Sequence, residues 1–244
     1  AEMKYDLVIA TGSMMQESLE KVAKEFPDTK FAIIDATSSL PNVASLVFAE
    51  DEGSFLVGAL AGMMTKTNQI GFVGGMDIPV IQKFKKGYEQ GALYANPNVK
   101  VNSIFVSSAN PFNDSGAGKV DTVKLIDETT SDVVYHAAGG SGEGVIDAAK
   151  EKGIYAIGVD SNQDGVAQGT VLTSMLKKVN VAVYNVVRDT NEVNFKGRTF
   201  KYGVKDGGVD TTTFEFTKDK IGEENLKKLN QIRDDLINDK IKIQ

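Results

Sequence analysis

The chain has 244 residues, a hydrophobic content of 41% and a formal net charge of −6, which is ordinary for a globular protein of one or two domains. An acidic chain lacks the basic face that nucleic acids require, so we expect no nucleic-acid partner. The absence of cysteine excludes disulfides, thiolate nucleophiles and cysteine-based metal sites. The single histidine, His136, leaves a zinc site or a Ser-His-Asp triad poorly supported, and no apolar run approaches the length of a membrane span.

The first part of the chain alternates short apolar strands with amphipathic helices. We predict strands at 5–10, 30–35 and 42–50 and helices at 13–26 and 51–66. Ser13 is the candidate N-cap of the first helix. Helix 51–66 is strongly apolar and rich in glycine and alanine, so we expect it to be buried and packed closely against a sheet.

A second set of elements starts at Gln69. We predict strands at 69–75, 99–107, 132–138 and 154–159 and helices at 79–95, 119–129 and 143–152. After Asp160 come a strand-like run at 171–178, a helix at 180–195, a strand at 198–205 and a last amphipathic helix at 221–241.

Most of these strands are nearly continuous apolar runs that end in Gly, Asp or Ser. A strand buried on both faces belongs to a parallel sheet covered by helices, so the fold class is α/β. Such sheets bind ligands at the carboxyl ends of their strands. The small and acidic residues at these ends predict a site for a polar small molecule.

The turn AAGGSGEG at 137–144 follows a strand and opens a helix. Its glycines, Gly139, Gly140 and Gly142, would let backbone N–H groups bind an anion or a hydroxyl group. The motif is neither a dinucleotide fingerprint nor a P-loop, and a plain tight turn explains it equally well.

Three aspartates end predicted strands: Asp35, Asp77 and Asp160. A carboxylate at such a place can accept hydrogen bonds from a sugar diol, or it can cap the next turn. The sequence leaves both interpretations open.

Phe112 is an aromatic residue in a polar, turn-rich segment at 107–118. Stacking on a planar ligand would contribute on the order of 1–3 kcal/mol, whereas a hydrophobic contact under the loop is the alternative.

Lys177 and Lys178 follow a strand-like run, and one of them could donate into a cleft, although solvated lysines are the usual outcome. His136 lies in an apolar strand and is expected to be a packed core residue.

Several segments together resemble one protein family. They include KFAIID, LPNVASLVFAEDEGSFLVGALAGMM, KTNQIGFVGGMDIPVIQKFKKGYEQGA, HAAGGSGEGV, AAKEKGIYAIGVDSNQ, VLTSMLKKVNVAVY and YGVKDGGV. The chain resembles, over nearly its whole length, the basic membrane protein family of bacterial ABC-transporter substrate-binding lipoproteins, typified by a purine nucleoside receptor.

The resemblance implies the type I periplasmic-binding architecture, in which two Rossmann-like lobes with parallel sheets are joined by three crossings and clamp a ligand. We therefore predict an incomplete N-terminal lobe at 1–67 plus about 178–197. The C-terminal lobe is predicted at 68–177 plus about 198–244.

The resemblance also implies site residues and a function. The base-stacking aromatic falls on Phe112, the ribose-binding acid on Asp160, the ribose-contacting lysine on Lys177 and a glycine partner within 139–142. The other candidates are Asp77 and, near a base-contacting position of the first lobe, Ser13 and Glu17. The implied function is binding of purine nucleosides for an ABC permease, without catalysis and without a cofactor.

The family pattern has about 60 further residues before the segment equivalent to YDLVIATGS, or roughly two strand–helix–strand units. From this difference we expect weakened or absent nucleoside binding. We expect a monomer, with association through the first lobe as an alternative. The resemblance implies an extracytoplasmic lipoprotein held at the cell membrane by a lipid anchor that lies outside this chain.

Two functions of other classes stay open. An α/β enzyme acting on a sugar or nucleotide would use Asp77 or Asp160 as general base, but it needs a second catalytic group at a convincing spacing. The effector domain of a transcription regulator would need a helix-turn-helix and a basic patch, and the sequence contains neither.

Overall fold

The computed structural model describes residues 4–244 and divides the chain into two compact units. Unit 1 comprises Ala1–Ala49 and Lys178–Gly208, and unit 2 comprises Glu50–Lys177 and Val209–Gln244. The chain therefore passes between the units three times. The helix–strand alternation and the parallel sheets of the α/β prediction are confirmed.

The unit boundaries differ from the predicted lobe boundaries in two places. Helix α2 (Glu50–Met64) belongs to unit 2, because it packs against helix α3 and strand β8 of that unit. Strand β9 (Thr199–Tyr202) belongs to unit 1, because it pairs with β3 from Ser45 onward. Strand pairing and helix contacts are tertiary features, which the order of elements along the chain does not reveal.

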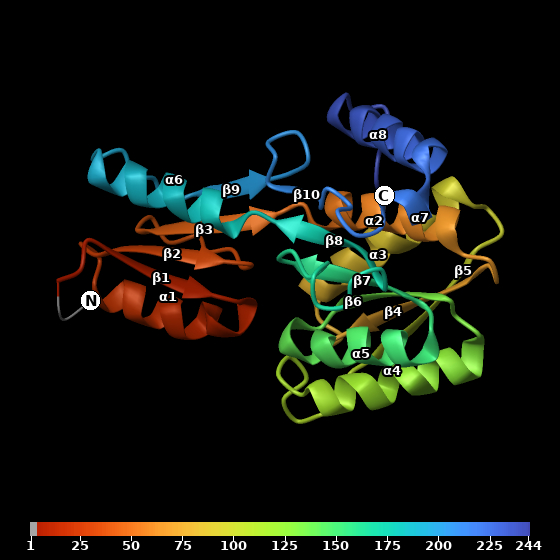
Figure 1. Cartoon of the computed structure of the whole chain (residues 1–244). Helices are drawn as coiled ribbons and strands as arrows, with labels where there is room; N and C mark the ends of the chain where they lie inside the picture. Colours follow the sequence, from red (N-terminus) through yellow and green to blue (C-terminus); the bar gives the residue numbers. More distant parts are fainter. Residues whose placement is uncertain (1–3) are drawn as a thin grey trace. The chain divides into compact units, whose positions relative to one another are not determined.

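Unit 1 is a four-stranded, fully parallel sheet with the order β1-β2-β3-β9 (Figure 1). Its elements are β1 (Leu7–Thr11), a short 3-10 helix (Ser13–Met15), α1 (Gln16–Glu25), β2 (Lys30–Ile34), β3 (Val43–Phe48), α6 (Val179–Asn191) and β9. β2 and β3 are almost completely buried, whereas β1 is only partly buried. Within residues 4–244, β1 pairs on one side only, so association through this unpaired edge stays a prediction.

Unit 2 is a six-stranded sheet with the order β10-β8-β7-β6-β4-β5. All pairs are parallel except β10 with β8. Its strands are β4 (Gln69–Gly74), β5 (Lys100–Phe105), β6 (Val133–Ala137), β7 (Tyr155–Asp160), β8 (Val171–Lys177) and β10 (Val209–Thr211), and its helices are α2, α3 (Pro79–Ala95), α4 (Ser115–Thr129), α5 (Gly142–Lys152), α7 (Lys218–Ile221) and α8 (Glu223–Ile237). A short 3-10 helix (Gly139–Ser141) precedes α5.

Helices cover both faces of the unit 2 sheet (Figure 1). α4 and α5 pack on one face through an aliphatic core to which Val73, Leu125 and Ile146 belong. α3 packs on the other face, where the rings of Phe72, Tyr88 and Tyr135 contact one another with centroids 5.1–6.3 Å apart. Burial on both faces explains why the strands are continuous apolar runs.

Helix α2 is buried, as predicted, but its closest contact is with helix α3 rather than with the sheet. A Cβ atom on Gly58 would lie 2.2 Å from the carbonyl oxygen of Tyr88. A Cβ atom on Gly91 would lie 2.0 Å from the carbonyl oxygen of Phe55. Glycines on both helices thus let the two backbones touch, and α2 also reaches the sheet through Gly53, beside Met175.

We expect the substitution Gly91→Ala to destabilise the protein by about 2 kcal/mol, because the new methyl group overlaps a backbone oxygen that cannot move independently of α2. The gain in helix propensity, about 1 kcal/mol, offsets only part of the overlap. Urea denaturation measures the effect. Gly165→Ala is the matched control, since its Cβ would meet nothing within 4 Å. Equal stability changes in the two variants would contradict the close contact.

Several elements differ from the prediction, including the first helix, because α1 begins at Gln16 with Met15 at its N-cap position and Ser13 does not cap it. α4 begins at Ser115 instead of 119, because Asp114 caps it with a hydrogen bond from the backbone N of Ala117 to Oδ1 (2.9 Å). The last helix is divided at Gly222, where φ is 80°. β10 was not predicted.

Among residues 4–244, no helix combines the length and apolar composition needed to cross a membrane.

Candidate functional site

Most of the predicted site residues lie at the carboxyl edge of the unit 2 sheet. β4, β6, β7 and β8 are parallel neighbours, so their carboxyl ends meet at the same edge. Asp160 ends β7 and Lys177 ends β8, while Gly139 lies two residues after the end of β6. The structure therefore brings Asp160, Lys177, Gly139 and, through the contacts given below, Phe112 to one edge of one sheet.

Asp160 and Lys177 form an ion pair, with 3.3 Å between Oδ1 and Nζ. The lysine side chain is only 6% exposed, whereas that of the aspartate is 47% exposed. Lys177 Nζ also lies 5.9 Å from the ring centroid of Phe84, so an aromatic ring covers part of the ammonium group. The arrangement places a fixed cation beneath a carboxylate that solvent or a ligand can reach.

Phe112 is half-buried and lies over the ends of β4 and β6. Its ring occupies the space where Gly75 has no side chain, since a Cβ there would lie 2.3 Å from the ring. Its carbonyl oxygen accepts a hydrogen bond from the backbone N of Gly140 (2.9 Å). Asp114 closes the loop that contains Phe112, because its Oδ2 accepts a 2.6 Å hydrogen bond from Ser108 Oγ. This hydrogen bond is the main reason why the pKa of the Asp114 carboxyl group is lowered.

The glycine turn is held mainly by bonds within the protein. The backbone N of Gly140 donates to Phe112, that of Ser141 to Ala138, and that of Gly142 to the preceding glycines. These amides are used internally, which favours the tight-turn interpretation over an anion cradle. Gly139 is exposed with φ 54°, so it remains the candidate for a close ligand contact.

Gly142 has a packing role. A Cβ at this position would lie 2.0 Å from the imidazole ring of His136, which is completely buried beneath the start of α5. The prediction that His136 is a core residue is confirmed. Burial lowers the pKa of His136 from its ordinary value of 6.5 to about 4, although the hydrogen bond with Gln163 and the charge of Asp160 act in the opposite direction.

The remaining candidates are one loop residue of unit 2 and three residues of unit 1. Asp77 is exposed in the β4–α3 loop, and its Oδ1 accepts a hydrogen bond from Gln82 of the first turn of α3. Ser13 and Glu17 lie in unit 1, just after β1, and Glu17 is exposed in the first turn of α1. Asp35 follows β2 with φ 65°. Their roles stay predictions.

Two residues at the site were not singled out from the sequence. Phe84 belongs to α3, and its helical spacing predicts only a core position. Gln163 follows Asp160 in a polar loop, but its side chain points back to the sheet and accepts hydrogen bonds from Val159 N (2.8 Å) and His136 Nε2 (3.0 Å). Only the tertiary structure places these side chains beside the predicted ones.

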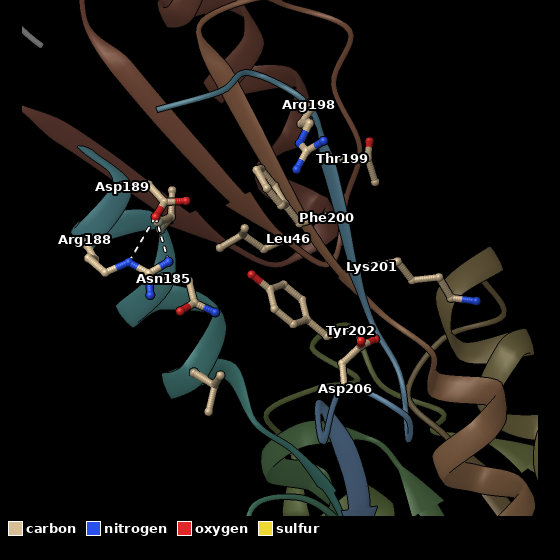
Figure 2. Close-up of a pocket in the computed structure, with 12 residues that line it drawn as sticks. Leu46, Asn185, Arg188, Asp189, Arg198, Thr199, Phe200, Lys201, Tyr202 and Asp206 are labelled. Atoms are coloured by element: carbon tan, nitrogen blue, oxygen red, sulfur yellow. Dashed lines mark hydrogen bonds and ion pairs between the residues drawn. The ribbon is translucent and has the colours of Figure 1, made fainter. Parts of the chain in front are cut away.

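Unit 1 contains a pocket of about 500 Å³ between α6 and β9 (Figure 2). Leu46 and Phe200 contribute apolar surface, and the guanidinium of Arg198 lies 4.6 Å from the Phe200 ring centroid. Arg188 is hydrogen-bonded to Asp189 at 2.8 and 3.2 Å. None of these residues was a site candidate from the sequence.

The two sheet-containing units and the three crossings between them are those of the type I periplasmic-binding fold, which a solved ABC solute-binding protein shares. Residues 1–244 match the family described as Bmp, ABC transporter substrate-binding protein PnrA-like. The chain belongs to this family, which consists of substrate-binding proteins rather than enzymes.

The chain is similar to curated relatives and to a solved structure over most of its length. A "CD4+ T-cell-stimulating antigen" of Listeria innocua is 33% identical, covering 98% of this chain and 70% of the relative. The "ABC transporter nucleoside-binding protein BmpA" of Lactococcus lactis is 35% identical, covering 84% of this chain and 63% of the relative. A crystal structure of an ABC transporter solute-binding protein from Aeropyrum pernix K1 is 28% identical with a TM-score of 0.89, covering 99% of this chain and 77% of that one.

Proposed function

We propose that this protein is the substrate-binding component of an ABC importer and that its ligand is a purine nucleoside. The observation that supports this proposal most strongly is the ion pair of Asp160 with Lys177 at the sheet edge where Phe112 also lies. The printed name of the Lactococcus lactis relative supports a nucleoside as the ligand class. The partner is a membrane permease, and the place of action is outside the cytoplasmic membrane, on a lipid-anchored protein.

The residues have separate tasks in this proposal. The purine stacks on Phe112, and the ribose hydroxyls donate to the carboxylate of Asp160, whose position Lys177 stabilises. Burying a hydroxyl group without a partner costs about 1–3 kcal/mol, so a carboxylate placed for the diol favours nucleosides over free bases. No bond is made or broken.

NMR titration of this chain tests the proposal. Of the two outcomes expected from the sequence, weakened or absent binding, the proposal takes the first: inosine, added to about 1 mM, should shift the backbone amide signals of Gly139 and Asp160, because binding weakened to a Kd in that range still populates the site measurably. Hypoxanthine, which lacks the ribose, should shift them less at the same concentration. Identical behaviour of inosine and hypoxanthine, or no shift with either, would contradict the proposal. Release of free base from inosine during the titration would favour an enzyme instead.

A further inference from the structure

The side chain of Gln163 ties the loop that follows β7 to the sheet. Its Oε1 accepts hydrogen bonds from the backbone N of Val159 (2.8 Å) and from Nε2 of His136 (3.0 Å). Because a carbonyl oxygen can only accept, Nε2 of His136 is the donor. Gln163 therefore closes the turn from 159 to 163, which contains Asp160, and ties this turn to β6.

The same residue is tied to β8. The backbone N of Gln163 donates to Ser174 Oγ at 2.9 Å, and Ser174 Oγ donates to Asp164 Oδ1 at 2.8 Å. Ser174 is completely buried and Asp164 is 3% exposed. We call these four residues, His136, Gln163, Asp164 and Ser174, the Gln163 network. It links the turn to the strands on both sides of β7.

Space for the network depends on Gly158. A Cβ atom at this position would lie 2.6 Å from Ser174 Oγ and 2.7 Å from Gln163 Oε1. The pairing of β7 with β8 also shifts register between Ala156 and Gly158. At Gly158, β7 therefore has no side chain, and beside it the pairing with β8 is irregular. Both features leave room for the hydrogen bonds of the Gln163 network.

Asp160 adopts a conformation that depends on its surroundings. Its φ of 64° lies in the left-handed region, which is uncommon for residues other than glycine, although aspartate and asparagine adopt it more readily than the others. The turn is closed on both sides of it by the bond between Val159 and Gln163 and by the bond from Ser161 N to Val159 O (2.7 Å). In this conformation the Asp160 carboxylate lies 3.3 Å from Lys177 Nζ.

We propose that Gln163 is a positioning residue, which holds Asp160 in the conformation that presents its carboxylate to two adjacent hydroxyl groups of the ligand. This inference rests on the proposed function and deepens it, because it makes Gln163 a determinant of preference for a ribose diol. His136 and Ser174 act through Gln163 and do not touch the ligand.

The first test compares inosine with 2′,3′-dideoxyinosine, which lacks the diol, by NMR titration of the Gln163→Met variant. We expect the affinity for inosine to fall about 10-fold, since small misplacement of a binding group has effects of this order or larger, and the affinity for the dideoxy compound to stay unchanged. Gln168→Met, at an exposed glutamine of the same loop, is the matched control. In an Asp160→Ala background, Gln163→Met should have no further effect on inosine binding.

Equal losses for both ligands, or the same loss with and without Asp160, would show a general structural effect and overturn the proposal. Hydrogen exchange without ligand separates this result from a failure of the proposed function. Gln163→Met should speed exchange of the Val159 and Ser161 amides, whereas Gln168→Met should not. If no nucleoside binds the wild-type chain, the proposed function fails, and unchanged exchange in Gln163→Met would overturn the positioning role independently.

Discussion

Replacing Asp160 with alanine is expected to weaken inosine binding by about 2–4 kcal/mol, which corresponds to roughly 30-fold to 1000-fold in Kd. In the bound state the ribose hydroxyls would lose their acceptor, and Lys177 would lose one of its partners while it stays almost completely covered. The carboxylate itself is half-exposed before binding, so its removal costs the ligand-free protein much less.

The backbone at Asp160 calls for a second variant. Alanine disfavours the left-handed conformation that Asp160 adopts, whereas asparagine tolerates it. Asp160→Asn therefore removes the charge while keeping the turn. Both variants and Asp147→Ala, an exposed carboxylate on α5, are compared by titration with inosine and by urea denaturation. Retention of wild-type affinity in both Asp160 variants would remove this residue from the site.

The second large effect concerns pH and the single histidine of the chain. The pKa of His136 is about 4 in the folded protein, chiefly because burial penalises the charged ring, against an ordinary value of 6.5. Between these values the unfolded chain binds a proton that the folded protein does not. The neutral His136 ring should therefore make its whole contribution to the free energy of unfolding above pH 6.5. As the pH decreases below 6.5, the free energy of unfolding should fall, by about 3 kcal/mol in total at pH 4.

Two measurements check this expectation. The ring signal of His136 in an NMR titration reports its pKa directly, because no other histidine contributes. Urea denaturation at pH 7 and pH 4.5 should show that His136→Asn loses about 2–3 kcal/mol less stability over this interval than the wild-type chain. A pKa near 6.5, or equal losses in both proteins, would mean that the ring is not buried as the structure has it.

The candidate site was partly predictable from the sequence. Asp160, Lys177 and Gly139 were predictable as edge residues, because each ends or follows an apolar run and parallel strands bring their carboxyl ends together. Phe112 stood out as an aromatic residue in a polar loop. Its place over Gly75 could not be predicted, because that contact joins segments from different loops.

Other site features depend on contacts that have no local signal. Gly142 belongs to a motif that suggests a ligand-binding turn, but its missing side chain makes room for His136. Gln163 is one polar residue among several after β7, and only the position of His136 and Ser174 gives it a role. Asp77 follows a predicted strand, as Asp160 does, but its carboxylate accepts a hydrogen bond from Gln82 in the first turn of α3.

The sequence by itself determined the alternation of strands and helices, the parallel character of the sheets and most element positions, including α3 at Pro79–Ala95. These features depend on apolar periodicity and turn residues, which act over a few neighbouring positions. The tertiary structure decided which unit holds α2 and β9, how closely α2 and α3 approach through Gly58 and Gly91, and how Asp160 is oriented. These depend on packing and hydrogen bonds between residues far apart in the chain, so they emerge only when the sheets have formed.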